Sequence, residues 1–285
     1  MAEGGRGRLY LVGTPIGNLE DITLRALRVL READLIAAED TRRARKLLSR
    51  YDIHTPLTSY HGHNEREKAE AVAREVEAGK KVALVSDAGM PGVADPGFRA
   101  VEECVRRGLE VEVVPGPSSL TAALALSGLP LARFRYEGFL PPARTRRRSR
   151  LMSLLGEGEA VVLYEAPHRI LDTMSDIAEL APERQVVLAR ELTKLHEEVL
   201  RGTADELLEA LRERRPRGEF VLVLAPGKEG EAPPLAQLAD EVSALVLSGE
   251  PTREAVRAVA QRHGVSQRDV YRAWLERREG RWRTD

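Results

Sequence analysis

SDAGMPGVADPG, residues Ser86–Gly97, directly follows the apolar run Val82–Val85 and indicates the architecture of the chain more clearly than any other stretch. An apolar β-branched run that ends at a loop of glycine, proline and aspartate is typical of a buried strand that opens into a ligand-facing turn. The glycines allow a ligand to approach the main chain closely. Of the two aspartates, Asp87 is the candidate ligand contact, and Asp95 is the candidate cap of a helix that begins near Phe98. A rigid connecting turn without a ligand is the alternative.

The composition is that of a globular chain. Its 285 residues, of which 42% are hydrophobic and 31% charged, are enough for two domains. The formal net charge of −1 favours neither a nucleic acid nor a membrane as partner, although it is compatible with a local basic face. The single cysteine, Cys104, excludes an intrachain disulfide and a thiolate zinc cluster. Because no apolar run approaches about 18 residues and no signal segment opens the chain, we expect a cytoplasmic protein without a membrane partner.

Between residues 8 and 227, short β-rich runs alternate with amphipathic helical runs, which predicts an α/β architecture with a largely parallel sheet. The expected strands are Leu9–Val12, Leu35–Ala38, Lys81–Val85, Glu110–Val114, Arg133–Gly138, Ala160–Tyr164, Val186–Glu191, Glu198–Gly202 and Phe220–Leu224. After about residue 115 the strands lie closer together along the chain, which predicts a partly antiparallel second sheet. We therefore expect two α/β subdomains, residues 8–127 and 128–227, then a linker at 228–234 and a C-terminal helical domain at 235–285.

The C-terminal segment contains two short amphipathic helices around a turn at residues 263–266, with the spacing of a helix-turn-helix. A small bundle that only packs is the alternative. The arginines of its exposed face favour contact with phosphates. They are Arg253, Arg257, Arg262, Arg268, Arg272, Arg277 and Arg278.

Polar residues follow the first two expected strands. The loop GTPIGNL, residues 13–19, matches neither the GxGxxG nor the Walker phosphate pattern, so a ligand-shaping role and a tight turn are both open. In AEDTRR, residues 38–43, two carboxylates precede two arginines. This pattern favours a charge network at the edge of the sheet, with a helix N-terminus that attracts acids as the alternative. His61 and His63 lack a second cluster of ligands, so we expect no metal.

Similar polar loops follow the later strands. Ser118 and Ser119 come after the strand that ends at Val114, and YEAPHR and ELTK follow two strands of the second subdomain. Several such loops predict a small-molecule site between subdomains. The basic run RTRRRSR, Arg144–Arg150, predicts contact with an anionic polymer, and a solvated helix face is its alternative.

These motifs together resemble the class III S-adenosylmethionine-dependent methyltransferases, the tetrapyrrole methylase superfamily. The motifs that carry the resemblance are VGTPIGNLEDIT, AEDTR, SYHGHNE, VALVSDAGMPGVADPG, VPGPSSLTAALALSGL, EGFLP, VLYEAPHR, RELTKLHEE and GEFVLVLAPG, in the order of the family. The long loop at residues 86–97 and YEAPHR are similar to the branch that methylates the ribose 2′-oxygen of a cytidine in 16S rRNA. The porphyrin-methylating branches have a shorter Gly-Asp-Pro loop there.

The resemblance implies two α/β subdomains with S-adenosylmethionine in the cleft between them, a homodimer, and 16S rRNA in the 30S ribosomal subunit as partner. The positions that match cofactor contacts of the family are Pro15, Asp87, Met90, Ser118, Ser119, Glu165 and Thr193. The positions expected to hold the RNA backbone are Arg42, Arg43, Arg144, Arg146, Arg147, Arg148 and Arg150.

Transfer of a methyl group from a sulfonium to an oxygen depends mainly on positioning, but a ribose hydroxyl needs a group that takes its proton. The candidates are Glu39, Asp40, His61, Glu191 and Lys194, of which a histidine or a neutral lysine is the more reasonable base. Two other functions stay open: a tetrapyrrole C-methyltransferase of the same fold, and a non-catalytic RNA-binding factor of ribosome assembly.

Overall fold

The structure is a computed structural model that describes residues 7–156, 158–213, 216–227, 234–263 and 265–278. The chain forms two compact units. The first consists of the residues up to Ala122 together with Leu192–Glu197, and the second of Ala123–Glu191 and the residues from Glu198 onward. Most of the expected linker, residues 228–233, lies outside the described residues. Within the described ranges, no helix has both the length and the apolar character that a membrane span requires.

The first unit is built on a parallel sheet with the strand order β3-β2-β4-β1-β5. Its strands are β1 (Arg8–Val12), β2 (Leu35–Ala38), β3 (Leu57–Ser59), β4 (Lys81–Val85) and β5 (Glu110–Val114). Its helices are the short 3-10 helix η1 (Leu19–Asp21), α1 (Leu24–Glu32), α2 (Thr41–Arg50), α3 (Glu65–Glu77) and α4 (Phe98–Arg106). Because all five strands run in the same direction, their carboxyl ends meet at one edge, where α/β proteins bind ligands.

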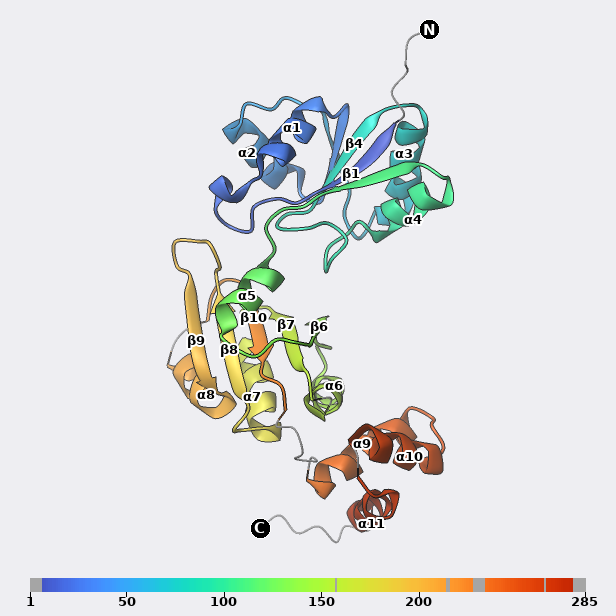
Figure 1. The fold of residues 1–285 in the computed structure, drawn as a ribbon, viewed down its shortest axis with the longest axis vertical. Coiled ribbons are helices and arrows are strands. Elements are labelled where there is room, and N and C mark those ends of the chain that lie inside the picture. The colour runs from blue at the N-terminus through green and yellow to red at the C-terminus, as the bar shows by residue number, and fades with distance from the viewer. Residues whose placement is uncertain (1–6, 157, 214–215, 228–233, 264, 279–285) are drawn as a thin grey trace. The chain divides into compact units, whose positions relative to one another are not determined.

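Helices cover both faces of this sheet (Figure 1). One core lies under α1 and α2, and a separate core lies under α3 and α4. The alternation of side chains along β2 assigns Ile36 and Ala38 to the first core and Ala37 to the second, as the two-residue period of a strand requires. Cys104 is fully buried in the second core, and burial raises the pKa of its thiol to about 11. The single cysteine is therefore a core residue.

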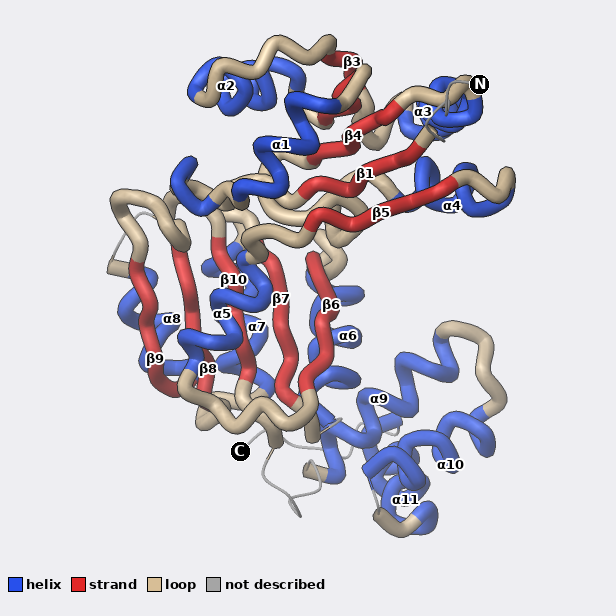
Figure 2. The backbone as a smooth tube through the Cα atoms, turned by 45° about the horizontal axis from the view of Figure 1, so that its top comes forward, coloured by secondary structure: helices blue, strands red, loops and turns tan. Residues whose placement is uncertain are grey.

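The second unit contains a mixed sheet with the strand order β6-β7-β10-β8-β9 (Figure 2). Its strands are β6 (Phe134–Phe139), β7 (Ala160–Glu165), β8 (Gln185–Arg190), β9 (Glu198–Thr203) and β10 (Phe220–Leu224). In this sheet β6 and β7 pair in parallel, and the other neighbours are antiparallel, as expected. Three helices, α6 (Arg144–Gly156), α7 (Ile170–Leu180) and α8 (Ala204–Arg212), form the main core with the sheet. The division between the units falls within α5 (Ser119–Ser127).

The C-terminal part of the second unit is a three-helix bundle of α9 (Leu235–Leu247), α10 (Thr252–His263) and α11 (Gln267–Arg278). At its centre Glu241 is 6% exposed, and it pairs with Arg262 and, at 2.7 Å, with the His263 ring. Arg277 similarly binds Asp240. Arg262 and Arg277 are exposed, as expected, but each already pairs with an acid of α9. Contact of this arginine face with phosphates stays a prediction. The predicted turn includes Gly264, which is outside the described residues.

Candidate functional site

The loops after β1 and β4 are joined at the carboxyl edge of the first sheet. The Thr14 amide donates to the Gly89 carbonyl at 2.9 Å, and the Gly89 amide donates to the Thr14 carbonyl at 3.1 Å. The Thr14 hydroxyl also donates to the Ser86 carbonyl at 3.3 Å, and this threonine is only 3% exposed. Two loops that are far apart in the sequence thus form one rigid wall.

The loop after β5 closes on the same wall through two glycines. A Cβ atom built on Gly13 would lie 2.7 Å from both the Gly116 Cα atom and the Met90 sulfur, closer than real Cβ atoms approach such neighbours. A Cβ atom built on Gly116 would lie 2.9 Å from the Gly13 main chain. Only glycine at both positions allows this approach. The predicted residues Pro15, Met90 and Ser118 are thereby brought to one edge of the sheet.

Asp87 connects the loops after β2 and β4. Its Oδ1 atom accepts a hydrogen bond from the Asp40 amide at 2.9 Å, and its Oδ2 atom lies 3.2 Å from Nη1 of Arg43. The Asp87 amide donates to the Glu39 carboxylate at 3.4 Å. Burial is the main cause that raises the pKa of Glu39, and the negative charge of Asp87 adds to it. The charge network expected from the sequence is therefore present.

Asp40 has a different role from its neighbour Glu39. It is the N-cap of α2, and its Oδ1 atom accepts from the Arg42 amide at 2.8 Å. The Arg42 guanidinium donates to both carboxylate oxygens at 3.2 and 3.0 Å, and these bonds lower the pKa of Asp40 to about 2. A carboxylate held ionised in this way is a weak proton acceptor. Asp40 thus fits the alternative interpretation of the AEDTRR motif, an acid at a helix N-terminus.

His61 follows β3 at the same edge. Its amide donates to the Asn64 side chain at 2.8 Å, and its ring lies 6.0 Å from the ring of His63. The buried Nδ1 atom of His61 has no hydrogen-bond partner among the described residues. A charged His61 would lower the pKa of Glu39, which identifies the two as electrostatic neighbours. No group of three metal-ligating side chains occurs in the described part of the chain.

The segment Leu192–Glu197 connects β8 and β9 but belongs to the first unit. The Thr193 hydroxyl accepts a hydrogen bond from the Asn18 amide at 3.0 Å, and the Lys194 side chain would collide with a Cβ atom on Gly17. Thr193 has a φ of 65°, a conformation that residues other than glycine rarely adopt and that clusters at functional sites. Thr193 and Lys194 therefore lie against the loop that contains Pro15. The sequence does not indicate this contact, because the two segments are far apart along the chain.

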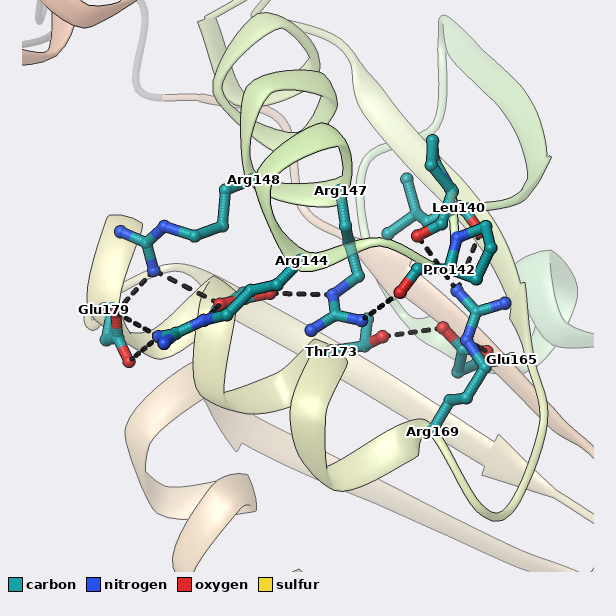
Figure 3. Close-up of polar contacts among 11 residues, drawn as sticks. Leu140, Pro142, Arg144, Arg147, Arg148, Glu165, Arg169, Thr173 and Glu179 are labelled. Atoms are coloured by element: carbon teal, nitrogen blue, oxygen red, sulfur yellow. Dashed lines mark hydrogen bonds and ion pairs between the residues drawn. The ribbon is translucent and has the colours of Figure 1, made fainter.

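Two other candidates lie in the second unit. Glu165 is 2% exposed at the end of β7, and it accepts from the Thr173 hydroxyl at 2.6 Å (Figure 3). It also accepts from the Ala166 amide at 2.9 Å. These bonds give the Glu165 carboxylate an internal role, and its contact with the cofactor stays a prediction. Glu191 accepts from the Glu219 amide at 2.9 Å.

The helix that follows the long loop of residues 86–97 is capped from a distance. Gly97, which has no side chain to act as an acceptor, is the N-cap of α4. The amides of Gly97 and Arg99 donate to the Glu65 carboxylate at 3.0 and 3.3 Å. The prediction that Asp95 is the N-cap of α4 is therefore wrong, because Gly97 occupies that position and Glu65 at the start of α3 supplies the acceptor.

The basic run of α6 is largely neutralised inside the second unit (Figure 3). Arg147 is 3% exposed, and its Nε atom donates to Asp176 at 2.7 Å. Arg144 and Arg148 share Asp176 and Glu179. Because the Arg147 guanidinium is buried, it has no exposed surface that RNA could contact. The prediction that Arg147 binds the RNA backbone is therefore wrong.

The remaining members of the run differ in their surroundings. Arg150 binds Glu137 at 2.5 Å, and Arg146 is exposed on the same helix. The prediction that the α6 run binds RNA thus retains Arg146, which takes part in no hydrogen bond or ion pair with the described residues.

The sequence also matches known proteins. A family model described as Tetrapyrrole (Corrin/Porphyrin) Methylases matches residues 8–208. The chain belongs to this family. The methylase is 52% identical over 223 residues to the Ribosomal RNA small subunit methyltransferase I of Thermotoga maritima, an alignment that covers 78% of the methylase and 100% of the relative. It is 43% identical over 278 residues to the protein of the same name from Escherichia coli O157:H7, covering 96% and 97% of the two chains.

Solved structures share the fold of the methylase. A diphthine synthase has a TM-score of 0.62 at 16% identity and covers 76% of the methylase and 89% of its own chain. A uroporphyrin-III C-methyltransferase from Thermus thermophilus has a TM-score of 0.54 at 24% identity and covers 86% and 100%. These likenesses support the α/β methylase fold. The methylase is a methyltransferase whose cofactor is S-adenosylmethionine.

We expect Asp176→Ala to lower the free energy of unfolding of the second unit by about 3–5 kcal/mol, because it leaves the Arg147 guanidinium buried without its partner. The matched control is Glu179→Ala, since that side chain is 46% exposed and its loss is expected to change stability by less than about 1 kcal/mol. Urea unfolding followed by circular dichroism measures both. Equal effects of the two substitutions would contradict a buried structural role for the α6 arginines.

Proposed function

We propose that the methylase transfers a methyl group to the ribose 2′-oxygen of a cytidine in 16S rRNA of the small ribosomal subunit. The observation that carries the proposal is the 43% identity, along nearly the whole of both chains, with a relative named for ribosomal RNA of the small subunit. The longer loop at residues 86–97 supports the same branch. The proposal includes assembled 30S subunits as partner, a homodimer and a cytoplasmic location, all of which rest on the resemblance.

We further propose that S-adenosylmethionine binds against the loops after β1, β4 and β5 of the first unit. The residues fit its chemistry. Asp87 presents a carboxylate that is 25% exposed and can accept hydrogen bonds from a ribose hydroxyl or an ammonium group, while Met90 offers apolar surface. Ser118 and Thr193 add hydroxyls. When bound, the cofactor supplies an electrophilic methyl group, so these residues have only to fix its position.

Among the five candidate bases we propose Glu39 as the group that takes the proton of the ribose hydroxyl. Asp40 is held ionised by Arg42. The Glu191 carboxylate accepts a 2.9 Å hydrogen bond from the Glu219 amide, shorter than the 3.4 Å bond that Glu39 accepts from the Asp87 amide. Glu39 is half-buried beside Asp87 and has a raised pKa, which strengthens it as a proton acceptor once it is ionised. This differs from the expectation of a histidine or lysine base. In this proposal His61 is an electrostatic neighbour that affects the pKa of the Glu39 carboxylate.

Incubation with tritiated S-adenosylmethionine and three acceptors tests the function. The acceptors are small subunits reconstituted with unmodified 16S rRNA, the same RNA without proteins, and uroporphyrinogen III. We expect label in the RNA of the subunits and, after alkaline hydrolysis, in an alkali-resistant dinucleotide, because a 2′-O-methyl group blocks cleavage at that position. Label in uroporphyrinogen would support the tetrapyrrole enzyme instead. No label, together with no heat of cofactor binding, would support an assembly factor.

Asp87→Ala is expected to weaken S-adenosylmethionine binding by about 10- to 100-fold, the effect of losing a hydrogen bond to a charged group. Isothermal titration calorimetry measures the affinity. The matched control is Asp34→Ala, because the Asp34 carboxylate also accepts a main-chain hydrogen bond, from Lys81 at 2.8 Å, but at the amino end of β4. Unchanged affinity in the Asp87 variant, or an equal loss in the control, would remove Asp87 from the cofactor site.

The pH dependence of methyl transfer tests the role of Glu39. A base must be ionised, so kcat is expected to fall as the pH drops through the Glu39 pKa, with a midpoint above the ordinary glutamate value. Glu39→Gln is expected to lower kcat by about 10²- to 10⁴-fold and to leave cofactor affinity unchanged. Asp40→Asn, which preserves a helix cap, is the control and should retain most of the activity. If the Glu39→Gln variant keeps the wild-type profile, Glu39 is excluded as the base.

A further inference from the structure

Helix α2 has an unusual charge content. Its ten residues, TRRARKLLSR, contain five cations and no acid, in a chain whose net charge is −1. Arg42, Arg45, Lys46 and Ser49 recur at helical spacing and therefore share one face. Together they line a shallow surface hollow of about 420 Å³. We call this surface the α2 basic face.

The cations of α2 differ in whether the protein itself neutralises them. Arg42 binds Asp40, and Arg43 binds Asp87. The exposed Arg45 and Lys46 take part in no hydrogen bond or ion pair with the described residues. Two adjacent positive charges without acids on the same helix repel each other, and the cations of the first turn also oppose the helix dipole. An anion in the hollow would relieve both unfavourable terms.

The α2 basic face starts beside the proposed reaction centre. Asp40 caps the helix directly after Glu39, and its amide donates to Asp87. From Arg42 to Ser49 the helix rises about 10 Å, so the hollow extends outward from the end of β2 along this distance. A nucleotide held near Glu39 carries a phosphate on each side. The phosphates that flank this nucleotide are therefore the RNA groups nearest to the α2 basic face.

The comparison with α6 favours α2 as the RNA contact. The α6 arginines face Asp176 and Glu179, which already satisfy Arg144, Arg147 and Arg148. Among the described residues, the acids that pair with α2 cations are Asp40 and Asp87, and their partners Arg42 and Arg43 belong to the first turn of the helix. The cations farther along α2 are left uncompensated.

We infer that the α2 basic face binds the phosphate backbone of the RNA substrate next to the target nucleotide. Arg45 donates to phosphate oxygens as a planar fork and Lys46 as a point charge, and the Ser49 hydroxyl adds a neutral donor. Such contacts set the register of the RNA and do not read its sequence. The inference rests on the proposed function, since it takes RNA as the substrate.

The test is the double variant Arg45→Ala/Lys46→Ala, with Arg66→Ala/Arg74→Ala as the matched control. The control removes two exposed cations from α3, which packs on the opposite face of the same sheet. Two readouts are used: KM for reconstituted small subunits, and the affinity for a fluorescein-labelled fragment of 16S rRNA over a series of salt concentrations. Calorimetry with S-adenosylmethionine checks that the cofactor site is intact.

For the α2 double variant we expect a tenfold or greater rise in KM and in the dissociation constant of the fragment, with unchanged cofactor affinity. The slope of log affinity against log salt should become shallower by about 1.4, from two lost phosphate contacts at about 0.7 each. Wild-type affinity and slope in this variant, or an equal loss in the α3 control, would overturn the inference. Failure of the proposed function is a separate result: the wild-type protein would then methylate no RNA, whereas selective loss of fragment binding would still support the phosphate site.

Discussion

The arrangement of the first unit depends on a close approach of main chains that only glycine permits. Gly13 and Gly116 leave no space for a Cβ atom between the loops after β1 and β5, and the Thr14–Gly89 bridge ties the first of these loops to the loop after β4. The three loops therefore form one wall at the carboxyl edge of the parallel sheet. Asp87, Met90 and Ser118 owe their positions to that wall. A side chain at either glycine would separate the loops and disperse these groups.

Residues of the same charge have different roles in this protein, because their electrostatic surroundings differ. Asp40 and Glu39 are adjacent in sequence, yet a guanidinium lowers the pKa of one while burial raises the pKa of the other. The arginines of α6 are compensated by acids of α7 about thirty residues away, whereas the outer cations of α2 are not. A count of local charges cannot make this distinction, because the compensating groups come from distant segments.

Much of the architecture could be predicted from the sequence. Alternating β-rich and helical runs indicate most strands within one or two residues, since buried parallel strands are apolar throughout. The strand β3 is not predicted, because Leu57–Ser59 is only three residues long and has no apolar run. Glu65 is not recognisable as the cap of α4, because it lies about thirty residues before that helix. The return of Leu192–Glu197 to the first unit is likewise a long-range contact without a local pattern.

Our central claim is that the wall formed by these three loops is where the methylase holds S-adenosylmethionine. Hydrogen–deuterium exchange, measured with and without saturating cofactor, tests it directly. We predict slower exchange in residues 13–18, 86–92 and 115–119 and in the segment 192–197, with little change in α9–α11. Protection confined to other segments, with these loops unaffected, would contradict it.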